Sequence, residues 1–257
     1  MDPRTSIDLD EMLMIFEIST SELDILFVLS IILVAVKITL LAILSKKEID
    51  HVKETGKLIF GFVFSVIVLM ICLAISRIIY MQFDFILTRL DANSFYEVPN
   101  VWYWKTATLI DSAGFSIFIF VTDYRIFKFK FKGLFAYIMM TFATTLFFYP
   151  VNTKADFDFL STFLLSANCV AIIIPIFFLY LGLTRSPYQI PSLGIAFGIF
   201  FYAIGASITT ESLITALISI FGEIARLIVY FFSLIFKIAG LAMFSYGVVK
   251  FATKFSK

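Results

Sequence analysis

Long apolar stretches separated by short charged segments make up almost the whole chain. A helix needs roughly 20 consecutive apolar residues to cross the ~30 Å hydrocarbon core of a bilayer. Windows of about that length predict seven membrane-spanning helices: Asp24–Leu44, Leu58–Tyr80, Trp102–Thr122, Gly133–Tyr149, Phe159–Leu183, Ile190–Ile208 and Glu223–Val249. The fourth and sixth windows are short, so six and eight spans are the alternatives to seven.

Two positions are expected to interrupt these helices. Pro175 predicts a kink in the fifth span, because proline lacks the N–H that bonds to the preceding helical turn. The apolar segment Thr209–Gly222 follows the sixth window too closely to cross the bilayer again. It either lies at the membrane interface or extends the last helix, and Gly222 is the expected break between the two.

The lysine and arginine residues between the spans predict the orientation, because cytoplasmic loops carry an excess of them. The basic set of connections contains Lys46, Lys47, Lys53, Lys57, Arg125, Lys128, Lys130, Lys132, Arg185, Lys250, Lys254 and Lys257. The other set contains Arg4, Arg89 and Lys154 together with most of the acidic residues. This alternation predicts a multi-pass protein of the cell membrane, with its N-terminus outside and its C-terminus in the cytoplasm.

Composition supports a membrane protein and excludes several other classes. Of 257 residues, 61% are hydrophobic and 15% are charged, and the mean hydropathy is +0.99. Soluble domains average about 45–50% apolar and about 25% charged residues. We interpret residues 1–257 as one all-α membrane domain: an acidic external N-terminus (1–23), seven spans (24–249) and a basic cytoplasmic tail (250–257). The net charge of +1 gives no reason to expect nucleic acid as a partner.

Residue types that serve catalysis or metal binding are scarce. The single histidine, His51, lies in a charged loop, and both cysteines, Cys72 and Cys169, lie within apolar runs. We therefore expect no bound metal, no cofactor and no enzymatic activity.

Four polar residues at bilayer depth form the predicted functional centre: Lys37, Asp111, Asn168 and Lys237. Polar groups in the hydrocarbon core cost free energy unless they are paired, so they are the first candidates for function. Asp111 is expected to pair with Lys37 or Lys237, either in a ligand site or in a structural ion pair. Snorkelling of Lys37 to the cytoplasmic headgroups is the alternative for that residue.

A second group of charges, Arg77, Glu223 and Arg226, is predicted near the outer surface. Glu223 and Arg226 are three residues apart on one helix and are expected to pair locally. Arg77 is expected to join Asp84 or Asp111. The group forms either a solvated rim or the mouth of an anion- or peptide-binding site.

A third group lies on the cytoplasmic side and consists of Arg125, Lys128, Lys130 and Lys132. The three lysines alternate with Phe127, Phe129 and Phe131. We expect this surface to contact anionic lipid of the bilayer or a cytoplasmic protein partner. The cytoplasmic loops are too short to hold an effector domain, so an output requires a partner.

Glycine spacing in the last two spans predicts close helix packing. Gly194, Gly198 and Gly205 fall on roughly one face of the sixth span, and Gly240 and Gly247 are one heptad apart on the seventh. Small residues allow helix backbones to approach closely in lipid. The contact is expected within the bundle, and a homodimer seam through Gly194, Gly198 and Gly205 is the alternative.

Three segments carry a resemblance to a known family. They are Pro175–Gly182 running into Arg185, the helix with Gly198 and Gly205, and the closing run Gly240–Gly247. In these segments the chain resembles uncharacterised archaeal seven-helix membrane modules, which are similar to sensory input modules of histidine kinases. The resemblance implies a non-enzymatic, receptor-like sensor that signals to a partner. The alternatives are a small-solute or ion transporter and a structural subunit of a membrane complex.

Two sharper similarities concern single segments. Lys237 and the residues that follow it are similar to the retinal-binding lysine segment of microbial rhodopsins, in which Asp111 would act as counterion. That family has Asp one turn earlier, where this chain has Ser233, so we do not expect retinal to bind. Asp123-Tyr124-Arg125 is a permuted form of the Asp-Arg-Tyr of G-protein-coupled receptors, and we interpret it as helix-end charge.

Overall fold

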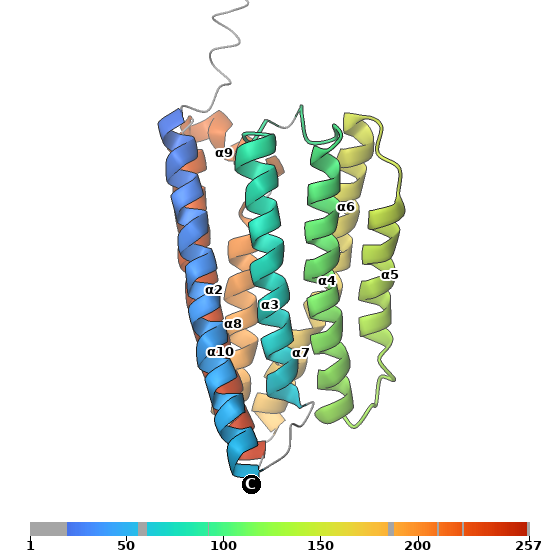
Figure 1. Ribbon diagram of the computed structural model, residues 1–257, viewed down its shortest axis with the longest axis vertical. Coiled ribbons are helices and arrows are strands. Elements are labelled where there is room, and N and C mark those ends of the chain that lie inside the picture. Colours follow the sequence, from blue (N-terminus) through green and yellow to red (C-terminus); the bar gives the residue numbers. More distant parts are fainter. Residues whose placement is uncertain are drawn as a thin grey trace, which may run out of the picture.

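The computed structural model describes residues 20–55, 61–91, 93–184, 188–209, 211–222 and 224–255, and within these ranges all regular structure is helical. The elements are α2 (Thr20–Thr55), α3 (Phe62–Met81), a π-helical turn η1 (Gln82–Leu87), α4 (Asn100–Arg125), α5 (Leu134–Phe148), α6 (Lys154–Ala171), α7 (Ile173–Thr184), α8 (Gln189–Ser207), α9 (Glu211–Phe221) and α10 (Ile224–Phe255). In Figure 1, α2, α3, α4, α5, the pair α6–α7, α8 and α10 run alternately down and up along the long axis. The predicted all-α class is confirmed.

Five helices of the described ranges are long and apolar enough to cross a membrane, namely α2, α3 continued by η1, α4, α8 and α10. The helices α5 and α7 are apolar but shorter. These lengths and compositions support a multi-pass helical membrane protein.

The helices enclose a common interior. Helix α2 packs on α3 and α10, α3 on α4, α4 on α5, α5 on α6, α7 on α8, and α8 on α10. Helix α10 also contacts α3 across the bundle. Near one end the interior is filled by aromatic rings: Phe62 lies 5.5–5.8 Å from Phe118, Phe178 and Phe251, measured between ring centroids. The polar interior described below lies on the other side of this aromatic cluster.

Both expected interruptions occur. The predicted fifth span is split at Ile172 into α6 and α7, because Pro175 cannot donate the hydrogen bond that would join it to Ala171, four residues earlier. Gly222 adopts φ +73°, a left-handed conformation that favours glycine, and it ends α9. Helix α9 is therefore a separate element, which excludes the alternative that Thr209–Gly222 extends the last helix.

Helices α2 and α10 are longer than a bilayer requires. Their 36 and 32 residues give lengths of about 54 and about 48 Å, against a hydrocarbon core of ~30 Å. The predicted first span ended at Leu44, whereas α2 continues as helix through Lys46, Lys47 and Lys53. Figure 1 shows both helices reaching past α3 and α4 at the end where the chain finishes.

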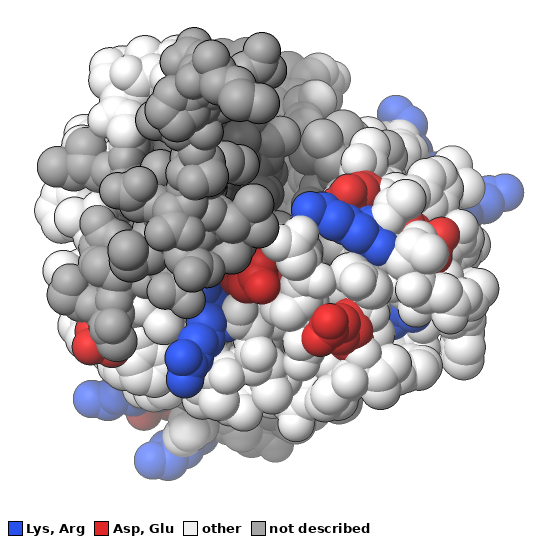
Figure 2. Space-filling model, turned by 90° about the horizontal axis from the view of Figure 1, so that it is seen from above, with Lys and Arg blue, Asp and Glu red and all other residues white. Residues whose placement is uncertain are grey.

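The two ends of the bundle differ in charge. We call the end at which α2 and α10 finish the basic end, because it carries Lys46, Lys47, Arg125, Lys128, Lys130, Lys132 and Lys250. Figure 2 looks onto the opposite end, where side chains of both signs are scattered over the described part of the surface and some of them lie next to one another.

Candidate functional site

Lys37 lies inside the bundle because the buried face of α2 passes through it. The buried residues Leu26, Ser30, Leu33 and Lys37 follow one another at spacings of four and three, which places them on one face of the helix. Lys37 is only 2% exposed, and its Nζ donates a hydrogen bond of 2.8 Å to the backbone oxygen of Leu73 on α3. Lys37 therefore turns into the interior and does not snorkel to the headgroups.

Asp111 on α4 reaches the same turn of α3. The Ser76 hydroxyl lies 3.3 Å from Asp111 Oδ1 and 3.3 Å from the Leu73 oxygen. A serine hydroxyl carries one proton, so Ser76 donates to one of these two acceptors at a time. Asp111 and Lys37 interact electrostatically but are not in ion-pair contact. The expected ion pair between Asp111 and a lysine is therefore not formed with Lys37. The two residues are connected instead through the Leu73 oxygen and the Ser76 hydroxyl of α3.

Arg77 forms an ion pair nearer the end opposite the basic end. Its NH1 lies 3.5 Å from Asp84 Oδ2, and its NH2 donates a 2.6 Å hydrogen bond to Ser30 Oγ on α2. The two charged side chains are 18% and 20% exposed, so the pair is not sealed from that end. The Nε atom of Arg77 is buried without a hydrogen-bond partner. Arg77 was expected to join Asp84 or Asp111, and in the structure it forms its ion pair with Asp84, which lies on η1.

Lys237 on α10 also faces the interior. A Cβ added to Gly205 on α8 would lie 3.0 Å from Lys237 Cγ, so the lysine chain lies directly against this glycine. Ser233, one turn earlier, donates a 2.5 Å hydrogen bond to the Gly205 oxygen. The charged groups that interact electrostatically with Lys237 are Arg77, Lys37 and Asp84. Asp111, the counterion implied by the rhodopsin similarity, is not among them.

We call Lys37, Ser76, Arg77, Asp84, Asp111 and Lys237 the polar centre. It connects α2, α3, η1, α4 and α10, and the Tyr202 ring of α8 lies 5.8 Å from Lys37 Nζ. A hydrogen bond of 2.7 Å between Tyr80 and Thr108 lies beside it on α3 and α4. The hydroxyl groups of Ser76 and Thr108 were not predicted from the sequence. Serine and threonine within otherwise apolar windows are the pattern that indicates such groups.

Two predicted site residues cannot be placed. Glu223 and the side chain of Asn168 lie outside the described residues. Arg226 is partly buried near the start of α10. The described ranges contain no group of three His, Cys, Asp or Glu side chains that could hold a metal ion.

Asp123 organises the loop at the basic end. Its buried carboxylate accepts hydrogen bonds from the backbone N–H groups of Phe131 (3.1 Å) and Gly133 (2.8 Å). Lys128 and Lys132 adopt left-handed φ angles of 55° and 51°, which non-glycine residues keep only where the surroundings hold them. The helix-end charge expected at this position therefore acts as the anchor of the loop.

Two of the three phenylalanines that alternate with lysine in this loop turn toward α7, while the exposed Phe129 packs on Phe120 and Tyr124. The rings of Phe127 and Phe131 pack on Phe177 of α7, each with a centroid distance of 4.8 Å. Lys128, Lys130 and Lys132 are exposed. The three lysines are therefore exposed, while Phe127 and Phe131 attach the loop to α7.

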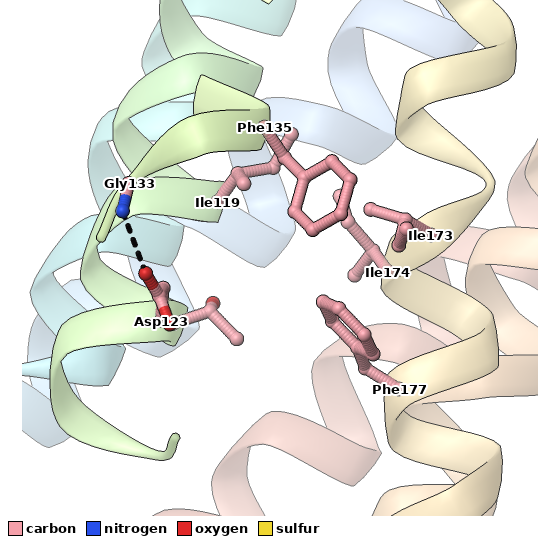
Figure 3. Close-up of a pocket in the computed structure, with 8 residues that line it drawn as sticks. Ile119, Asp123, Gly133, Phe135, Ile173, Ile174 and Phe177 are labelled. Carbon is pink, nitrogen blue, oxygen red and sulfur yellow. Dashed lines mark hydrogen bonds between the residues drawn. The ribbon is translucent and has the colours of Figure 1, made fainter. Parts of the chain in front are cut away.

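A small pocket lies behind this loop, between α4, the start of α5 and α7. It is lined by Ile119, Thr122, Asp123, Gly133, Phe135, Ile173, Ile174 and Phe177. Figure 3 shows Ile173, Ile174 and Phe177 facing Asp123 across it, with Ile119 and Phe135 beside one another at one end and the Gly133–Asp123 hydrogen bond at its edge. Because Ile173 begins α7, the pocket borders the break between α6 and α7.

Helices α8 and α10 are in direct backbone contact. A Cβ on Gly240 would lie 2.5 Å from the Tyr202 nitrogen and 2.6 Å from the Gly198 oxygen, and one on Gly194 would lie 3.3 Å from Gly247 Cα. The predicted packing within the bundle is therefore present. The same contact covers the glycine surface that a homodimer through α8 would need.

No protein-family model, no curated protein and no solved structure matches this chain. The polar centre and the basic end are therefore the features on which a function can rest.

Proposed function

We propose that the protein is a receptor-like sensor of the cell membrane, which changes conformation around the polar centre and signals to a protein partner at the basic end. The observation that carries this proposal is the position of Ser76, whose single proton has two acceptors at the same distance of 3.3 Å. Such a group has two alternative hydrogen-bonded arrangements, and a two-state element is what a sensor requires.

The two arrangements connect different helices. With Ser76 donating to Asp111, the ammonium of Lys37 holds the Leu73 oxygen and links α2 to α3. With Ser76 donating to the Leu73 oxygen, Asp111 loses its hydroxyl donor and becomes the stronger acceptor for Lys37. The second arrangement links α2 to α4, so the switch changes which helices are held together.

Helix α4 provides the route from the polar centre to the basic end. Asp111 and Asp123 lie 12 residues apart on this continuous helix, a distance of about 18 Å. A shift of α4 at Asp111 therefore displaces the anchor of the lysine loop. The pocket beside Asp123 gives α7 room to follow.

The proposal includes seven crossings with the N-terminus outside. It is supported by the antiparallel order of the helices and by the lysines gathered at the basic end. Helix α5 has 15 residues, about 22 Å, and crosses where the bilayer is locally thinner. The orientation is tested with single cysteines at Lys130 and Lys154 in a chain whose Cys72 and Cys169 are replaced by alanine. Labelling of both positions from the same side of the membrane would contradict it.

The conformational mechanism is tested with a pair of spin labels at Leu134 and Leu183. These exposed positions lie on α5 and α7 at the basic end, on either side of the pocket. Asp111→Asn removes the charge that attracts Lys37 and is expected to change the label-to-label distance distribution. Asp158→Asn makes the same substitution at an exposed position of α6 and is expected to leave it unchanged. An unchanged distribution in folded Asp111→Asn would refute the mechanism.

A carrier for a small solute or ion is the second candidate. It is favoured by the partial exposure of Arg77 and Asp84 and by the interrupted helix α6–α7, since broken helices near the midplane are typical of transporters. Flux of solutes into proteoliposomes, lost on Asp111→Asn, would favour the carrier over the sensor.

A further inference from the structure

The loop between α4 and α5, residues 126–133, carries three lysines without a partner in the described part of the chain. Lys128, Lys130 and Lys132 are exposed, and none of them forms an ion pair or a side-chain hydrogen bond with a described residue. The preceding carboxylate, Asp123, is buried and already accepts two backbone hydrogen bonds. No aspartate or glutamate follows it in the sequence until Asp156. The described residues therefore leave the positive charge of this lysine loop without a neutralising group.

The backbone of the lysine loop is held in one conformation. Lys128, Phe129 and Lys132 adopt left-handed φ angles of 55°, 59° and 51°. Non-glycine residues keep such angles only where the surroundings hold them, and the segments that clamp ligands are among the places where this occurs. The backbone oxygen of Asp123 accepts a 2.9 Å hydrogen bond from the Phe129 N–H, in addition to the two bonds to its carboxylate. The backbone positions that carry the three lysines are therefore fixed relative to one another.

Exposed aromatic rings lie beside the lysines. Phe129, which lies between two of them in the chain, is 38% exposed and packs edge-on against Phe120 and Tyr124 at centroid distances of 5.8 and 6.0 Å. The exposed ring of Tyr137 on α5 contacts Phe120 at 6.3 Å. We call these four residues the aromatic patch. It joins α4, the lysine loop and α5 on the outside of the bundle.

The aromatic patch continues an exposed apolar surface of α4 and α5. On α4, the exposed Ile117 lies three residues before Phe120. On α5, the exposed Leu134 and Met140 lie three residues on either side of Tyr137. Residues three apart are neighbours on a helix surface, so these side chains extend the patch along both helices. In a multi-pass protein such an apolar surface faces acyl chains, and aromatic rings are enriched where acyl chains meet headgroups.

We propose that the lysine loop binds the phosphate headgroup of an anionic phospholipid, with the aromatic patch against the adjoining part of its acyl chains. Lysines beside a bilayer are attracted to anionic lipid, and the patch brings these lysines to the depth of the headgroups. The inference goes beyond the proposed sensor and uses only its membrane arrangement. It leaves the ends of α2 and α10, which reach past α3 and α4, for the protein partner (Figure 1).

The test measures lipid binding to the purified, delipidated full chain in a neutral detergent by native mass spectrometry. Phosphatidylglycerol and phosphatidylcholine with identical oleoyl chains are titrated separately, so that only the headgroup differs. We expect the dissociation constant of the first bound lipid to be at least tenfold lower for phosphatidylglycerol. Equal constants for the two lipids would overturn the proposal and leave the surface to an acidic protein partner.

Two double variants locate the site. Lys128→Gln/Lys130→Gln removes the charges on either side of Phe129 and is expected to reduce the preference for phosphatidylglycerol to less than threefold. Lys46→Gln/Lys47→Gln removes two charges from exposed positions of α2 at the same end and is expected to retain the preference. An equal reduction in both variants would show that the total charge of the basic end attracts the lipid, and would overturn the proposal.

A third variant distinguishes a preformed site from general electrostatic attraction. Asp123→Ala removes a negative charge beside the lysine loop and releases the loop backbone. General attraction predicts that this variant binds phosphatidylglycerol more tightly, whereas a preformed site predicts weaker binding. We expect the dissociation constant to rise at least threefold, and an unchanged or lower constant would contradict the site. If this variant does not fold, the two double variants decide.

The label distances at the basic end separate this proposal from the proposed function. A preference for phosphatidylglycerol without a change of distance in Asp111→Asn supports the lipid site and contradicts the sensor. A distance change in Asp111→Asn without a lipid preference supports the sensor and contradicts the lipid site.

Discussion

Lys37 on α2 and Asp111 on α4 are connected through a single turn of α3: the ammonium binds the Leu73 oxygen, and Ser76 lies within hydrogen-bond distance of that oxygen and of the carboxylate. Two opposite charges from different helices therefore depend on the same backbone carbonyl and the same hydroxyl. The energy of either charge depends on the presence of the other.

The first prediction concerns this coupling. Lys37→Met leaves the Asp111 carboxylate in the interior without its cationic neighbour, and we expect it to lower the free energy of unfolding by about 3 kcal/mol. In Lys37→Met/Asp111→Asn both charges are absent, so we expect the loss to be smaller than the sum of the two single losses by at least about 1 kcal/mol. Unfolding titrations in mixed detergent micelles measure the four forms. Strictly additive losses would show that the two residues act independently.

The second prediction concerns the contact of α8 and α10. A methyl group on Gly240 would meet the backbone of Tyr202 and Gly198, which cannot rotate away. We expect Gly240→Ala to lower the free energy of unfolding by about 2–3 kcal/mol, because overpacking forces the helices apart. Gly194→Ala serves as the matched variant in the same seam. Its Cβ would approach Gly247 Cα to 3.3 Å, so we expect a smaller loss. Equal losses would mean that the helices are not held at this separation.

The third prediction concerns the anchor of the lysine loop. Asp123→Ala leaves the N–H groups of Phe131 and Gly133 without their acceptor, and we expect a loss of about 2 kcal/mol or more. The left-handed residues of the loop would then relax, and trypsin would cleave after Lys128 and Lys132 faster than in the unaltered chain. Asp50→Ala, at an exposed position of α2, is the control. Unchanged cleavage rates in Asp123→Ala would show that the aromatic contacts alone fix the loop.

The fourth prediction concerns pH and the start of α6. Asp156 Oδ2 accepts hydrogen bonds from the Asn152 and Thr153 N–H groups and from the Thr153 hydroxyl, while the Asp156 N–H donates to that hydroxyl. This is a capping box. The Asn152 N–H, the Thr153 hydroxyl and the Thr153 N–H, in that order, lower the pKa of Asp156 below its ordinary value of about 3.8.

A carboxylate with a lowered pKa in the folded protein stabilises it above the pKa of the unfolded chain, and this contribution is lost as the pH falls through the folded value. We therefore expect hydrogen exchange at Asn152 and Thr153 to be protected at pH 5. Below about pH 4 this protection should decline more than that of other helix starts. Asp156→Asn is expected to lack the decline. A parallel decline in both proteins would assign it to another group.

The positions of most helices were predictable because apolar windows mark them directly. The predicted Trp102–Thr122 and Ile190–Ile208 differ from α4 and α8 by three residues or fewer at either end. The end of α2 was not predictable in this way, since its last turns are charged and the apolar window that marks the span stops before them. The break at Ile172 followed from Pro175 because proline acts on its own preceding turn.

The contacts within the polar centre were less predictable than its members. Lys37, Asp111 and Lys237 stand out as charges within apolar windows, but their partners depend on how α3 is rotated relative to α2, α4 and α10. That rotation is set by packing between elements distant in sequence. Ser76 was missed for the same reason, and the π-helical turn that brings Asp84 to Arg77 has no signature in the hydrophobic pattern.

The excess length of α2 and α10 has a mechanical consequence. Both are single helices that extend past α3 and α4 at the basic end (Figure 1), so in the proposed membrane arrangement each behaves as a lever whose fulcrum lies inside the bilayer. The tip of α2 lies roughly 30 Å from the bilayer centre, and a tilt of about 10° at that centre would move it sideways by about 5 Å. If the protein acts as proposed, an interior rearrangement of one hydrogen bond would thus reach a partner at the basic end as a displacement the size of a side chain.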